Sequence, residues 1–167
     1  MSYHHPLLLA LFTATPCFAG QVVLTWGDPA YFTDIEPGVG TPKATLASVQ
    51  RAFTGSFSAA ATGLPEGYTF KADIRNVDLA GQVNPPQAMN PNLISTRVMT
   101  ANYFPTLTLD YALTDASGKI QTAGENIIIT DMDYLSRTNS VASSIPYFYE
   151  DQMIRNWFNR SIMAAVK

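Results

Sequence analysis

The chain has 167 residues and a formal net charge of −3, and only 14 % of its residues are charged. Its 10 lysines and arginines are scattered singly, which argues against a nucleic-acid-binding surface, because a phosphate backbone is bound by a stripe or patch of positive charge. The length fits one ordinary domain whose hydrophobic core is large enough to be stable without disulfides.

Residues 1–19 have the three-part plan of a secretory signal peptide. A short polar start precedes the apolar run Pro6–Phe12, and small residues stand at Cys17 and Ala19, the two positions that signal peptidase reads. The run is about half of the roughly 20 apolar residues that a membrane-spanning helix needs. We therefore expect cleavage between Ala19 and Gly20 and no transmembrane segment in the mature chain; a buried N-terminal element is the alternative.

Cleavage there would remove the only cysteine, Cys17, and both histidines, His4 and His5. The mature chain would then lack the usual zinc and copper ligands and the side chain best suited to proton transfer near neutral pH. Catalytic triads of the Ser-His-Asp or Cys-His type are excluded for such a chain. The G-x-S-x-G, S-x-x-K and P-loop motifs are also absent from the sequence. We expect no cofactor and no enzymatic activity.

The first half of the mature chain is predicted to contain a strand and a helix. Residues 21–26 alternate as a strand, and a loop then runs to Gly40. Thr41 is a typical helix cap and Pro42 fits the first turn, where its missing N–H costs nothing. Gly63 and Pro65 stop this helix. Apolar residues recur along it at helical spacing, at Leu46, Val49, Phe53, Phe57 and Ala60.

Residues 68–79 are predicted to form a second strand. Its alternation changes phase near Asn76, which indicates a β-bulge. Residues 81–92 hold several prolines and asparagines and are predicted to be a loop. Residues 94–99 follow as a short edge strand.

The second half of the chain is predicted to hold a hairpin and a last helix. Residues 106–114 and 119–130 alternate as two strands around a turn at 115–118, and about 146–165 form the helix. Its expected apolar face is Ile154, Trp157, Phe158 and Ile162. This order of elements predicts a single α+β domain over residues 20–167, with two helices on one face of a mostly antiparallel sheet of four to five strands.

Two acidic clusters are candidates for chemistry. Asp28, Asp34 and Glu36 follow the first strand, and Asp131 and Asp133 follow the hairpin. If the clusters met in space, paired carboxylates could act as acid and base on a glycosidic bond. They could also supply oxygen ligands for calcium, although the motif lacks the glycine and distal glutamate of an EF-hand. The plainer interpretation is structural, because Asp often starts a turn by bonding its own backbone.

Two aromatic groups are candidates for a sugar or peptide groove. They are the pair Tyr31 and Phe32 and the triplet Tyr147-Phe148-Tyr149, each beside turn residues that make burial of the whole group difficult. The alternative is that these side chains belong to the core.

Five stretches carry an ordered set of motifs, among them V-x-x-W-x-D-P, D-L-A-G, L-D-Y-x-L-x-D and D-x-D-Y. Their order resembles that of a family of exported proteobacterial proteins described as a domain of unknown function. The resemblance implies a Gram-negative periplasmic location. It implies no activity and no catalytic residues, because none is assigned to the family. The stretches are Val22–Ile35, Asp78–Gly81, Pro105–Asp115, Gly124–Tyr134 and Trp157-Phe158.

Together these observations favour a non-catalytic binding or envelope-accessory module, with an unknown envelope protein or a glycan as its partner. A carboxylate-dependent glycan hydrolase using Asp28, Asp34 or Asp131 is the first alternative, and a calcium-stabilised module is the second. The hydrolase needs two carboxylates roughly 5–9.5 Å apart. The candidate surface or binding residues are Asp28, Tyr31, Phe32, Asp34, Asp131 and Asp133.

Overall fold

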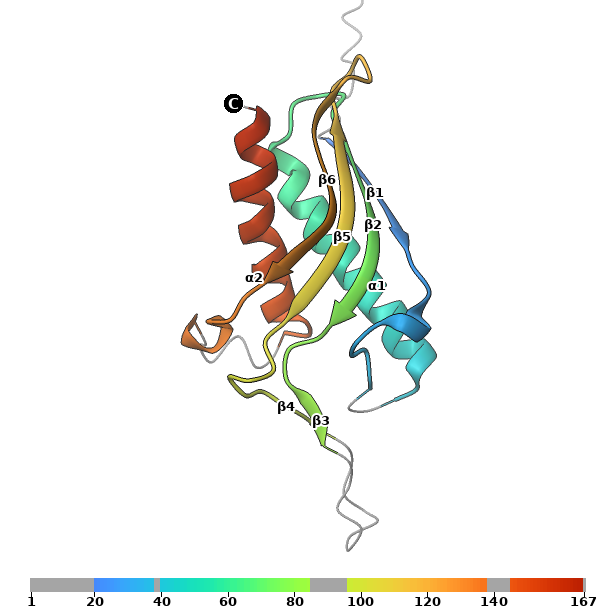
Figure 1. The fold of residues 1–167 in the computed structure, drawn as a ribbon, viewed down its shortest axis with the longest axis vertical. Coiled ribbons are helices and arrows are strands. Elements are labelled where there is room, and N and C mark those ends of the chain that lie inside the picture. The colour runs from blue at the N-terminus through green and yellow to red at the C-terminus, as the bar shows by residue number, and fades with distance from the viewer. Residues whose placement is uncertain (1–19, 38–39, 85–95, 138–144, 167) are drawn as a thin grey trace, which may run out of the picture.

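A computed structural model of the protein describes residues 20–37, 40–84, 96–137 and 145–166 (Figure 1). The predicted signal peptide and most of the predicted 81–92 loop lie outside these ranges.

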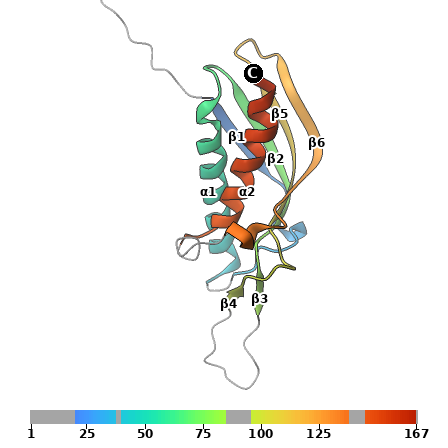
Figure 2. The same ribbon diagram turned by 90° about the vertical axis from the view of Figure 1, so that its left-hand side faces the viewer.

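Four strands form the main sheet, in the order β1-β2-β5-β6. β1 runs parallel to β2, whereas β2–β5 and β5–β6 are antiparallel pairs. Two helices, α1 and α2, pack against each other on one face of this sheet (Figure 2). The prediction of one α+β domain with two helices on a mostly antiparallel sheet is confirmed. The elements span Gln21–Trp26 (β1), Pro42–Ala60 (α1), Thr69–Asp78 (β2), Thr106–Thr114 (β5), Ile120–Thr130 (β6) and Phe148–Trp157 (α2).

Helix α1 is the crossover that makes the β1–β2 pair parallel. Two parallel neighbours cannot be joined by a tight hairpin, so the chain must return along the sheet through a longer connection. The helix begins as predicted: Thr41 Oγ1 accepts a hydrogen bond from the Ala44 N–H at 3.3 Å, and Pro42 occupies the first turn. A 3₁₀ turn, Ala61–Gly63, ends it.

The bulge predicted in β2 lies where the phase of the sequence changes. The register between β2 and β5 shifts between Ile74 and Asn76. The Asn76 amide, turned out by the bulge, accepts from the Thr33 N–H at 2.7 Å and donates to the Thr33 hydroxyl at 2.8 Å. The bulge therefore also anchors the loop that follows β1.

The segment after β2 differs from the prediction. Gln82–Asn84 is a strand (β3) and not loop, and it pairs antiparallel with Thr96–Val98 (β4) in a separate two-stranded sheet. Gly81 causes the departure: its φ of +77° turns the chain out of the main sheet, and a Cβ there would lie 2.6 Å from the Val98 carbonyl oxygen. Of the predicted edge strand 94–99, residues 94–95 lie outside the described ranges, and the described part, β4, belongs to the two-stranded sheet and not to the main sheet.

Helix α2 is also less regular than predicted. It is α-helical only to Trp157, continues as a π-helical segment, Phe158–Ile162, and ends in a 3₁₀ turn, Met163–Val166. It starts from Tyr147, whose φ of 58° is left-handed. Within the described ranges, no helix is long and apolar enough to cross a membrane.

The core lies between the sheet and the two helices and is rich in aromatic rings. Phe70 of β2 stacks on Phe57 of α1, with ring centroids 5.6 Å apart, and packs edge-on against Phe158 at 5.0 Å. Of the predicted apolar face of the last helix, Ile154, Phe158 and Ile162 are fully buried. Trp157 is only partly buried, against Tyr111 at 5.4 Å. One ring of the predicted core therefore reaches the surface.

Candidate functional site: a groove between β6 and α2

Asp28 and Asp34 of the first acidic cluster already accept hydrogen bonds from other groups of the protein. Asp28 caps the 3₁₀ turn Pro29–Tyr31, accepting a hydrogen bond from the Ala30 N–H at 2.9 Å. Asp34 accepts a hydrogen bond from the Glu36 N–H at 2.8 Å. It also accepts hydrogen bonds from both terminal nitrogens of the Arg97 guanidinium, at 2.7 and 3.0 Å. The Asp34 and Arg97 side chains are only 20 % and 15 % exposed.

Arg97 ties β4 to the end of the main sheet. Besides Asp34, its guanidinium donates to the backbone carbonyls of Ala80, Gly81 and Glu36. Planar guanidinium groups suit such multiple bonding, because their donors are fixed in a fork. No pattern in the sequence indicated this anchor, since Arg97 and Asp34 lie 63 positions apart.

The second cluster lies at the other edge of the sheet. Asp131 follows β6, and the Asp133 carbonyl accepts bonds from Ser136 that start a short turn. Because β1, β2 and β6 run in one direction, Asp28 and Asp131 lie at the same end of the sheet. The two strands that carry them are separated by β2 and β5, or about 14 Å at the usual strand spacing. Asp28 and Asp131 are therefore not brought together.

No three acidic, histidine or cysteine side chains gather as a potential metal site in the parts of the chain that the structure describes.

The aromatic candidates are divided between surface and core. Tyr31 is 81 % exposed, whereas Phe32 is a core residue at 8 %. Of the triplet, Tyr149 is buried against Tyr134, with ring centroids 4.7 Å apart, and Tyr147 packs edge-on against Phe53.

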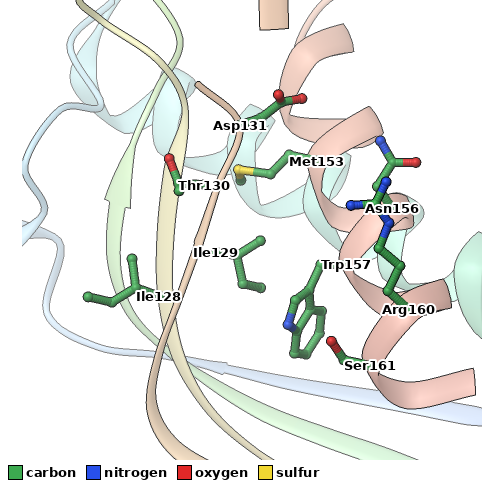
Figure 3. Close-up of a pocket in the computed structure, with 9 residues that line it drawn as sticks. All are labelled: Ile128, Ile129, Thr130, Asp131, Met153, Asn156, Trp157, Arg160 and Ser161. Atoms are coloured by element: carbon green, nitrogen blue, oxygen red, sulfur yellow. The ribbon is translucent and has the colours of Figure 1, made fainter. Parts of the chain in front are cut away.

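A groove runs between the end of β6 and the last helix, and we call it the β6–α2 groove (Figure 3). Its volume is about 270 Å³. Its apolar lining comes from both walls: Ile129 belongs to β6, and Met153 and Trp157 belong to α2. Polar groups surround these side chains. The lining residues are Ile128, Ile129, Thr130, Asp131, Met153, Asn156, Trp157, Arg160 and Ser161.

The helical wall of this groove combines unpaired polar groups with irregular backbone. The side chains of Asn156, Arg160 and Ser161 make no hydrogen bond or ion pair with any other described residue, and Trp157 makes ring contacts only. They stand at helical spacing, so they share one face. Arg160 and Ser161 belong to the π-helical segment, a rare conformation that often occurs at functional sites.

Comparison with known proteins places the chain in a family. Residues 20–160 match the family described as protein of unknown function, DUF3016. The chain belongs to the DUF3016 family. No curated protein matches it. The solved structure of a PelC dodecamer from Paraburkholderia phytofirmans is similar over 81 % of this chain and 83 % of that chain, at 13 % identity and a TM-score of 0.26. That score is too low to carry any property over.

Two of the stretches on which the resemblance to a domain of unknown function rested contact each other in this DUF3016 chain. Asp110, between Leu109 and Tyr111 of β5, accepts a hydrogen bond from the Asn126 N–H of β6 at 2.7 Å. Asn126 has a left-handed φ of 51° within an irregularity of the β5–β6 register. This bond, and then the Arg75 guanidinium, hold the pKa of Asp110 below its usual range. The two stretches therefore have a structural connection.

Proposed function

We propose that the protein is a non-catalytic binding module of the Gram-negative periplasm, and that its ligand site is the β6–α2 groove. The observation that carries the proposal is a set of polar side chains, Asn156, Arg160 and Ser161, that have no partner among the described residues and gather around the partly buried Trp157. Ligand sites commonly combine an apolar surface with a few polar groups that fix orientation.

The arrangement favours binding of a polar ligand over burial of an apolar one. Trp157 offers a partly exposed hydrophobic surface, while Asn156 and Ser161 each offer a donor and an acceptor. Asn156 is half-buried, and Arg160 and Ser161 are exposed, so the hydrogen-bonding groups of all three are accessible to a ligand.

The carboxylates support a role without catalysis. Asp131 is the one carboxylate that lines the groove among the described residues, whereas hydrolysis of a glycosidic bond ordinarily needs two. Asp28 and Asp34, the other members of the hydrolase alternative, are a turn cap and an ion-pair partner. The periplasmic location rests on the signal-peptide pattern of residues 1–19 and on the family resemblance.

Two asparagines of the last helix, three positions apart, provide a matched test of the groove. Asn156 lines the groove, whereas Asn159 is exposed on the same helix and does not line it. Purified protein would be mixed with peptidoglycan sacculi and with envelope polysaccharide, and co-sedimentation measured. We expect Asn156→Ala to weaken binding by about tenfold, the effect of one lost hydrogen bond in a site, and Asn159→Ala to bind as the parent does.

Equal binding by both variants would contradict the assignment of the groove. Absence of binding to either material would contradict a glycan of the envelope as the partner.

A further inference from the structure

We propose that the ligand of the β6–α2 groove is an acidic sugar, and that Arg160 binds its carboxylate. This inference rests on the groove being the ligand site and adds the chemical class of the ligand.

Two of the unpaired groups can only donate hydrogen bonds. The Arg160 guanidinium has five N–H donors and no acceptor, and the Trp157 indole has a single N–H donor. Both side chains come from the same wall of the groove (Figure 3). Arg160 forms no ion pair with any residue in the described ranges, although arginine at a binding site ordinarily faces an anion. A ligand group with two acceptor atoms and a negative charge would pair with the N–H donors of this wall.

The size and the remaining groups favour a sugar. The volume of about 270 Å³ lies just under the roughly 300–1,000 Å³ of sites for drug-sized ligands, so the groove suits one sugar-sized unit. Asn156 and Ser161 can each donate and accept, which matches the hydroxyl groups of a sugar ring. Partly buried Trp157 supplies apolar surface for its C–H faces, and the buried side chains of Ile129 and Met153 lie beneath it.

The position of Asp131 gives the ligand a direction. Asp131 lies on the β6 side and Arg160 on the helix side, so the groove has an acidic wall and a basic wall (Figure 3). A carboxylate on the ligand would be attracted to the Arg160 guanidinium on the helix side. The acidic group of the sugar should therefore face the helix.

A charged sugar and its neutral ester separate this inference from the existence of the site. Digalacturonate, its methyl ester and the peptide acetyl-Ala-Ala would be titrated into the purified protein, with binding measured by calorimetry. We expect digalacturonate to bind and both comparison ligands to bind at least tenfold more weakly, because the ester lacks the charge and the peptide lacks the ring hydroxyls. Added salt should weaken digalacturonate binding, since an exposed ion pair is screened.

Variants of one exposed arginine in the groove and one outside it complete the test. Arg160→Gln should weaken digalacturonate binding about 10- to 100-fold, the effect of a lost charge-assisted hydrogen bond. Arg160→Lys should restore only part of it, because an ammonium group cannot bind a carboxylate through two parallel bonds. Arg51→Gln on α1, also exposed, is the control and should leave binding unchanged.

Equal binding of acid and ester, equal binding of the acetylated peptide, or unchanged binding by Arg160→Gln would overturn the acidic-sugar assignment. If a neutral envelope glycan bound in a manner that needs Asn156 while digalacturonate did not bind, the groove would remain the site and the ligand class proposed here would be wrong.

Discussion

Glu150, in the first turn of α2, is a carboxylate enclosed by the protein. Its residue is only 4 % exposed, and its Oε1 accepts a hydrogen bond from the Ala80 N–H at 2.8 Å. This bond attaches the start of α2 to the turn between the main sheet and β3. Burial raises the pKa of Glu150, an effect opposed by the hydrogen bonds and by the charge of Arg97.

The raised pKa predicts how stability depends on pH. Above the pKa of glutamate in the unfolded chain, the folded state holds the proton more tightly than the unfolded state does. Stability should therefore fall as pH rises from that value to the higher folded pKa, and then stay level. Glu150→Gln, which keeps an acceptor for Ala80, should lose this dependence, so its stability relative to the parent should increase with pH across that interval.

Chemical denaturation of both proteins between pH 4 and pH 8 measures the effect. Glu66→Gln, at an exposed loop position, is the control and should follow the parent. A Glu150→Gln variant that tracks the parent at every pH would contradict the argument.

Asp34 and Asp28 illustrate two structural uses of a carboxylate, and their amide variants should differ. Asp34→Asn removes the charge that holds the largely buried Arg97, which should lower the free energy of unfolding by about 1–3 kcal/mol. Asp28→Asn keeps an oxygen that can cap the turn, so its change should stay within about 0.5 kcal/mol. Urea denaturation measures both. Similar losses in the two variants would mean that the Arg97 bonds contribute little.

At the scale of elements, the exit from β2 depends on one glycine. Gly81→Ala would place a Cβ 2.6 Å from the Val98 carbonyl oxygen at a φ of +77°, so we expect a loss of about 1–3 kcal/mol. Gly55→Ala in α1 has free space for its Cβ and should stabilise the protein by about 0.5–1 kcal/mol. Thermal unfolding of the two variants would test the pair. If Gly81→Ala left the stability unchanged, the turn would have to be able to rearrange.

The last helix divides its aromatic residues between core and groove. Phe158→Ala should cost about 3–5 kcal/mol, because the ring is fully buried among Phe57, Phe70 and Trp157. Trp157→Ala should cost less, roughly 1–3 kcal/mol, because part of its surface is already in water. Urea denaturation gives both values. A greater loss for Trp157→Ala would place that indole in the core and weaken the case for the groove.

For the whole molecule, cleavage of the predicted signal peptide, residues 1–19, decides which chemistry the mature chain can carry out, because the cysteine and both histidines lie in that segment. Protein recovered from the envelope should begin at Gly20 and should show no thiol after denaturation, because the predicted cleavage after Ala19 would remove Cys17. N-terminal sequencing and thiol titration measure these. An intact Met1, or one thiol per chain, would contradict both the cleavage and the exclusion of cysteine and histidine chemistry.

Local patterns predicted most of the fold. The alternation of β5, the cap at Thr41 and the bulge at Asn76 depend on residues close together in the chain, and each is found where it was expected. The β3–β4 pair was missed because it depends on Gly81 and on a partner strand more than ten positions away.

The candidate site was less predictable than the fold. Asp131 was selected, but Asn156 and Arg160 were not, because polar residues at helical spacing are also typical of a solvent-exposed helix face. Asn156 and Arg160 differ from ordinary surface residues because they face the end of β6 across the groove. That arrangement depends on the packing of α2 beside β6, which the sequence does not reveal. The irregular π-helical turn had no signal in the sequence that we could identify.

The two tryptophans can report whether the ligand binds in the β6–α2 groove. Trp157 lines the groove, whereas Trp26 lies on β1 against Phe53 and serves as an internal control. Soluble envelope polysaccharide fragments would be titrated into ¹⁵N-labelled protein while the two indole N–H signals are followed by NMR. We expect a saturable shift of the Trp157 signal and a constant Trp26 signal. Saturable binding that moves other signals and leaves Trp157 unchanged would contradict it.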